Sequence, residues 1–77
     1  MKSINKMFKY PIIIEKADGN YSAYCPDLLG CIATARTLGE TRRLIKGAIE
    51  LHIEGMKKEG LAIPEPHLKI EYVKEAL

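Results

Sequence analysis

The residues with the most chemical potential are two cysteines, two histidines and one aspartate. Cys25 and Cys31 are separated by five residues, which is not the spacing of a C-x-x-C redox pair, and no second pair completes a zinc site. His52 and His67 stand 15 positions apart, without a partner at ligand spacing. Asp27 follows a proline, where an aspartate commonly organises a turn. We therefore expect two buried thiols and no metal site.

Other signatures of catalysis are missing from the chain. It has no Gly-rich phosphate loop, no nucleophile elbow and no paired-carboxylate motif. We predict that the protein is not an enzyme and has neither catalytic residues nor a cofactor. The 12 basic and 10 acidic residues give a net charge of +2, which argues against a protein devoted to nucleic acid.

The length of 77 residues allows one domain. A chain this short has a thin core, so self-association would stabilise it. The N-terminus has lysines but no apolar run of signal-peptide length, and no stretch approaches the ~18 apolar residues needed to span a bilayer. We expect a cytosolic protein whose cysteines stay reduced.

The first half of the chain predicts a β-hairpin. Apolar residues alternate over about 8–17, which indicates a strand, and a second strand follows over about 20–25. Between them, Asp18-Gly19 is a strong two-residue turn signal, in which both positions favour positive φ.

The stretch "YCPDLLGC" predicts a sharp connection between two strands. Pro26 has no N–H for a ladder and should end the second strand, and Gly30 lets the backbone reverse. The third strand then covers about 31–36, with Cys31 and the small alanines on the core side.

The register implied by the turn predicts an apolar row on the outer face of the sheet. It pairs Ile13 with Tyr24, and Ile32 of the third strand joins them. A helix on one side leaves this face uncovered, and contiguous exposed apolar residues usually mark an interface. We predict that these three residues form an oligomer interface.

The second half of the chain predicts one long helix and a fourth strand. Thr37 and Glu40 have the spacing of a capping box, and helical apolar spacing continues to about residue 58. Gly60 is the expected C′ residue. Alternation over 67–73 indicates a strand, so the order is β-β-β-α-β in an α+β single domain.

The stretch "YSAYCPDLLGCIATARTLGETRRLIKGAIELHIEGMKKEGLAIPEP", residues 21–66, resembles the N-terminal domain of HicB family antitoxins. Further upstream, "YPIIIEKADGN" extends the resemblance to Tyr10. The most specific motif residues are Pro26, Asp27, Leu28, Gly30, Cys31, Thr37 and Glu40.

The resemblance implies a partial ribonuclease-H-like fold without the catalytic acids of the nuclease. It implies a HicA partner, a small basic toxin with a double-stranded-RNA-binding-domain-like fold that cleaves mRNA with a histidine. The antitoxin would cover the toxin's active site and RNA-binding face, in a type II toxin-antitoxin system. Candidate toxin contacts are Asp27, Glu50 and Glu54, and a homo-oligomer (dimer or tetramer) is expected.

The chain departs from the family pattern in three ways. Leu29 replaces a common proline, which removes some rigidity from the connection. At the helix start this chain has Arg36, Gly39 and Arg42, where relatives commonly have two acidic residues and a leucine, in that order. The helix start is therefore basic. Only 11 residues follow Pro66, too few for the helix-turn-helix or ribbon-helix-helix of longer relatives. We therefore expect one domain over 1–77 and no direct operator binding.

Two alternatives remain open from the sequence. The first is a small nucleic-acid-binding module that uses the basic first half, namely Lys2, Lys6, Lys9, Arg36, Arg42, Arg43 and Lys46. Its affinity would fall steeply with salt. The second is an orphan oligomeric scaffold with no toxin partner.

Overall fold

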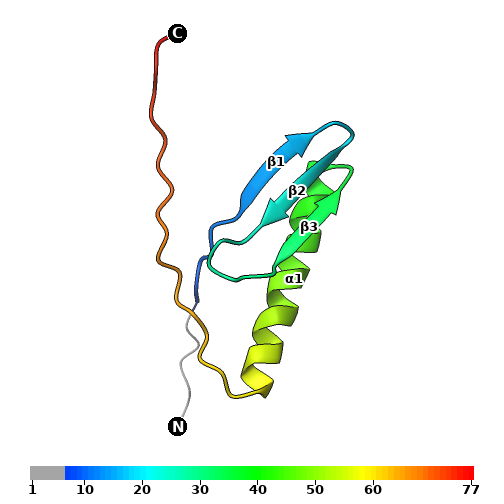
Figure 1. Cartoon of the computed structure of the whole chain (residues 1–77), viewed down its shortest axis with the longest axis vertical. Coiled ribbons are helices and arrows are strands. Elements are labelled where there is room, and N and C mark those ends of the chain that lie inside the picture. Colours follow the sequence, from blue (N-terminus) through cyan, green and yellow to red (C-terminus); the bar gives the residue numbers. More distant parts are fainter. Residues whose placement is uncertain (1–6) are drawn as a thin grey trace.

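The computed structural model describes residues 7–77 and contains a three-stranded sheet covered on one side by a helix (Figure 1). The elements are β1 (Ile13–Ala17), β2 (Asn20–Tyr24), β3 (Ile32–Ala35) and α1 (Leu38–Lys58). The strands are antiparallel in the order β1-β2-β3, and α1 packs against β2 and β3. This confirms the expected α+β class, the first four elements and their order.

The hairpin has the predicted register, with Ile13 opposite Tyr24 and Ile14 opposite Ala23. The expected turn geometry was wrong at Asp18. Gly19 has φ of 78°, but no non-glycine residue among those described has positive φ. One negative and one positive φ is the pattern of a type II turn rather than type I′. The first strand is also shorter than predicted and begins at Ile13.

The connection between β2 and β3 is two consecutive turns. The Leu28 N–H donates to the Cys25 carbonyl at 3.1 Å, and the Cys31 N–H donates to the Leu28 carbonyl at 3.3 Å. The Cys25 N–H closes the loop onto the Cys31 carbonyl at 3.1 Å. Gly30 lies in the second turn with φ of 88°, a conformation that favours glycine. The predicted roles of Pro26 and Gly30 in ending β2 and reversing the chain fit this geometry.

The core is thin because α1 contributes only one fully buried apolar side chain, Ile45. The small residues of β2 and β3 face the helix, as predicted, and Ile49 and Ile53 pack at the edge of the cluster. Among the described residues, the buried apolar ones are Ala23, Cys25, Leu28, Cys31 and Ile45.

The N-terminus of α1 is capped by Thr37. Its hydroxyl accepts a hydrogen bond from the Glu40 N–H at 3.1 Å, which satisfies one of the free donors of the first turn. The Glu40 carboxylate lies 3.7 Å from the Arg43 guanidinium. The hydrogen bond to the Thr37 side chain, which is one half of the predicted capping box, is therefore present. The Glu40 side chain points along the helix toward Arg43.

The C-terminus of α1 ends in a Schellman motif. Gly60 has φ of 71° and donates its N–H to the Lys57 carbonyl at 3.1 Å. The Leu61 N–H donates to the Met56 carbonyl at 2.9 Å. These are the two bonds of the motif, with glycine at C′ as predicted.

The predicted fourth strand is wrong for this chain. Residues 61–77 are all described and contain no strand. The segment leaves the end of α1 and runs clear of the sheet to the C-terminus (Figure 1). An alternating sequence suits a strand, but a strand also needs an edge to pair with, and residues 67–77 are exposed throughout. The extended segment explains the elongated dimensions of 55 × 28 × 20 Å.

Candidate protein-binding surfaces

The two cysteines are buried and free. Cys25 is 3% exposed and Cys31 is 4% exposed, as expected for small core residues. Burial raises the pKa of the Cys31 thiol, and repulsion from Cys25 raises it further. Because the thiolate is the reactive form, this site is poorly suited to nucleophilic or redox chemistry. Residues 7–77 contain no cluster of three or more His, Cys, Asp or Glu side chains that could hold a metal ion.

Asp27 lies inside the structure rather than on its surface. Its side chain is 1% exposed, and neither carboxylate oxygen accepts a hydrogen bond from the described residues. The nearest cation candidate is His67, whose Nδ1 lies 3.3 Å from Oδ1 of Asp27 and 3.2 Å from the Glu65 carbonyl oxygen. An ionised carboxylate without hydrogen bonds is costly to bury, so this position is under electrostatic strain.

Tyr10 makes a second contact with the C-terminal segment. Its hydroxyl donates a hydrogen bond to the Pro64 carbonyl. Burial raises the pKa of Tyr10 above its usual 10.0, and the negative charges of Cys25 and Asp27 add to the rise. The hydroxyl is therefore held in the protonated form that can donate. Together with the contact between His67 and Asp27, this bond holds the start of the C-terminal segment against the body of the domain.

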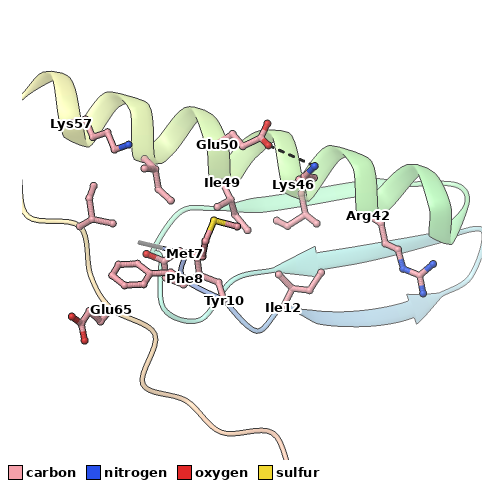
Figure 2. Close-up of a pocket in the computed structure, with 13 residues that line it drawn as sticks. Met7, Phe8, Tyr10, Ile12, Arg42, Lys46, Ile49, Glu50, Lys57 and Glu65 are labelled. Carbon is pink, nitrogen blue, oxygen red and sulfur yellow. Dashed lines mark ion pairs between the residues drawn. The ribbon is translucent and has the colours of Figure 1, made fainter. Parts of the chain in front are cut away.

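A groove of about 910 Å³ separates α1 from the extended residues 7–12 (Figure 2). It exists because α1 covers β2 and β3 and leaves the side of β1 open. Isoleucines line its floor, among them Ile12, Ile49 and Ile53, and Arg42, Lys46 and Lys57 stand at its rim. Sequence reasoning missed this groove because it treated residues 8–12 as part of the first strand.

The outer face of α1 combines apolar and acidic side chains. Leu44 is 43% exposed and Leu51 is 71% exposed, on either side of a shallow hollow at Gly47. Glu50 and Glu54 line the same hollow, and Glu50 lies 3.9 Å from Lys46. Both glutamates were predicted from the sequence as toxin contacts, whereas the leucines were not. The signal in the sequence was that Leu44 and Leu51 are seven residues apart, on a side of the helix away from its buried residues.

The outer face of the sheet carries the predicted apolar row. Cross-strand pairing brings Ile13 next to Tyr24 and Tyr24 next to Ile32. Ile13 is half-buried, Tyr24 is 42% exposed and Ile32 is 66% exposed. No other element among residues 7–77 packs against this face. The placement agrees with the prediction, whereas the role as an interface stays a prediction.

These features define a class of small α+β domain whose uncovered apolar faces suit the binding of other proteins. None of the helices formed by residues 7–77 has the length and apolar character to cross a membrane. A family model for HicB-like antitoxins of bacterial toxin-antitoxin systems matches residues 10–76. The chain belongs to this HicB-like antitoxin family, and the expectation of a non-enzymatic protein is thereby confirmed.

Individual relatives give the same assignment. The chain is 36% identical over 66 residues to a 14.9 kDa protein of Haemophilus phage HP1, covering 86% of this chain and 50% of the phage protein. It is 36% identical over 67 residues to a UPF0150 protein of Synechocystis, covering 86% of this chain and 85% of that one. The chain thus spans half of the phage protein and most of the cyanobacterial one.

A solved structure is similar in both fold and sequence. It is a HicA3 and HicB3 toxin-antitoxin complex, one chain of which superposes with a TM-score of 0.64 at 32% identity. The match covers 78% of this chain and 70% of that chain. The predicted resemblance to HicB antitoxins is confirmed by both the family and this structure.

Proposed function

We propose that this protein neutralises a HicA-type mRNA-cleaving toxin by binding it stoichiometrically and covering its active site. The observation that carries the proposal is the similarity, at 32% identity and a TM-score of 0.64, to a chain of a HicA3 and HicB3 complex. Family membership over residues 10–76 supports the same role. The action is proposed to take place in the cytosol.

The toxin is proposed to dock on the outer face of α1. Leu44 and Leu51 supply apolar area there, and Glu50 and Glu54 supply negative charge. The resemblance implies a basic toxin, so this combination offers both apolar and electrostatic complementarity. Glu50 is 67% exposed, and its weak pairing with Lys46 at 3.9 Å leaves the carboxylate available to a stronger partner.

Asp27 is proposed to act differently from the two glutamates. Its carboxylate lies beneath His67, so a toxin side chain would reach it only if the start of the C-terminal segment moved. A toxin lysine or arginine arriving there would supply the hydrogen bonds that the carboxylate lacks.

The apolar row of Ile13, Tyr24 and Ile32 is proposed as a self-association surface, separate from the toxin face. It lies on the opposite side of the sheet from α1, so both faces are accessible at once. A homo-oligomer would hold several antitoxin copies together while each binds a toxin.

The experiment tests binding and charge together. The chain would be used as bait for the product of the small reading frame next to its gene, and mRNA cleavage would be scored with and without bait. We expect a tight complex and no cleavage. The double variant Glu50→Lys with Glu54→Lys should weaken the complex at least tenfold and restore cleavage.

The matched control carries the same charge change elsewhere. Glu15→Lys with Glu75→Lys alters two exposed glutamates outside α1 and should leave inhibition intact. Equal loss of affinity in both double variants would reject α1 as the docking face. Failure to capture a toxin, with salt-sensitive RNA binding instead, would favour the nucleic-acid module, and failure to bind either would favour the orphan scaffold. Of the basic residues in the first alternative, Lys2 and Lys6 lie outside the described residues.

A further inference from the structure

The C-terminal segment has the sequence of a strand but no partner. Residues 67–73, "HLKIEYV", alternate in polarity, and every residue from 67 to 77 is exposed. Ile70 is 51% exposed, Tyr72 is 92% exposed and Leu68 is 46% exposed. These three share one side of an extended chain. An apolar strand face exposed to water, with unpaired backbone N–H and C=O groups, would be stabilised by pairing with the edge of a sheet.

The same chain also has an unpaired edge. Within residues 7–77, β1 pairs with β2 on one side and with no strand on the other. An edge of this kind presents free N–H and C=O groups to an incoming strand. Beside it lies the groove of about 910 Å³, whose floor includes Ile12, Ile49 and Ile53. A strand added at β1 would place one of its faces over this apolar floor.

The C-terminal segment starts beside Tyr10, just before β1, and then diverges from that strand (Figure 1). Tyr10 holds the Pro64 carbonyl, and Asp27 lies beside His67, so two contacts fix the direction in which the segment leaves the body. From there it runs clear of the sheet in both views (Figures 1 and 2). Its 11 residues beyond Pro66 extend for up to about 40 Å, which is ample to reach another molecule.

We propose that residues 67–73 of one copy add as a strand to the free edge of β1 in a second copy, and that the exchange is reciprocal. A second copy is the occupant that fits, because residues 7–77 of each chain offer both an unpaired strand sequence and a free edge at β1 with an apolar groove beside it. The other free edge, at β3, contributes no residue to this groove. Two copies related by a two-fold axis satisfy both at once and close the assembly. Leu68, Ile70 and Tyr72 then cover the isoleucine floor of the partner's groove, which enlarges a core that has five buried apolar residues within 7–77.

The proposed exchange does not depend on the toxin or on the row at Ile13. Its groove meets the outer face of α1 at Glu50, which lines both hollows. The test is NMR on an equal mixture of ¹³C,¹⁵N-labelled and unlabelled chain, unfolded and refolded together. We expect nuclear Overhauser contacts between the labelled 68–72 segment and unlabelled β1 protons. The amides of this segment should exchange with solvent at least 100-fold more slowly than in an unstructured peptide.

Two variants test the predicted face. Ile70→Asp should halve the mass of the assembly in sedimentation and abolish the protection of 68–72. Val73→Asp introduces the same charge on the opposite side of the segment and should leave mass and protection unchanged. Contacts confined to labelled chains would overturn the proposal in favour of pairing within one molecule. Rapid exchange in the 68–72 segment, whatever the mass, would overturn it as well.

Discussion

Nδ1 of His67 lies 3.3 Å from Oδ1 of Asp27, which brings the C-terminal segment over the turns that connect β2 and β3. The two partners differ sharply in environment, because the Asp27 side chain is 1% exposed and that of His67 is 78% exposed. The exposed imidazole compensates a buried carboxylate only weakly. The motif aspartate is therefore a costly group in the isolated chain.

This relationship predicts that Asp27→Asn stabilises the protein. The amide keeps the shape and the turn preference of the aspartate but removes a buried charge that accepts no hydrogen bond. We expect the free energy of unfolding in urea to rise by about 1 kcal/mol. His67→Ala should destabilise the wild type by less than ~1 kcal/mol and have no effect in the Asp27→Asn background. A marked loss of stability in Asp27→Asn would mean that the carboxylate makes a contact that folding requires.

The hydrogen bond from Tyr10 to Pro64 predicts a dependence on alkaline pH. The folded state raises the pKa of Tyr10, so this group stabilises folding fully below its unfolded pKa of about 10 and loses that contribution as pH rises through the higher folded value. Tyr10→Phe should cost about 1 kcal/mol at pH 8. The difference from wild type should shrink above pH 10 in urea titrations followed by circular dichroism.

The control for this pH effect is Tyr21→Phe. It keeps the ring that lies 6.0 Å from the Lys16 ammonium and removes a hydroxyl that makes no hydrogen bond within residues 7–77, so stability should stay close to that of wild type. If the difference between wild type and Tyr10→Phe stayed constant from pH 8 to 11, the hydroxyl proton would have no part in fixing the C-terminal segment.

The Schellman motif predicts opposite effects for alanine at two glycines. Gly60 has φ of 71°, which strains any side chain, so Gly60→Ala should destabilise the protein by about 1 kcal/mol. Gly55 lies inside α1 with open space around its Cβ position, so Gly55→Ala should stabilise it by about 0.5–1 kcal/mol. Thermal unfolding of the two variants should therefore shift in opposite directions. Similar shifts would show that the helix end does not depend on the left-handed residue.

The features predicted from the sequence are those encoded by neighbouring residues. The Asp18-Gly19 turn and period-two alternation sufficed for the hairpin register, and Thr37 and Gly60 sufficed for the helix ends. Local signals could not supply the contact between Tyr10 and Pro64, which are 54 positions apart. The expected fourth strand failed for the same reason, since alternation over 67–73 encodes a strand conformation but not the edge that receives it.

The outer face of the sheet provides the last prediction, which concerns self-association. Ile13 and Ile32 flank Tyr24 in one cross-strand row, so an aspartate at either end would place a charge inside an apolar contact. Ile32→Asp is the cleaner variant because Ile32 is 66% exposed in the single chain, so its replacement should not disturb the fold of the protomer. We expect both Ile13→Asp and Ile32→Asp to halve the mass measured by light scattering. Ala17→Asp, at the far end of β1, should keep the wild-type mass. An unchanged mass in Ile32→Asp would reject this face as the oligomer interface.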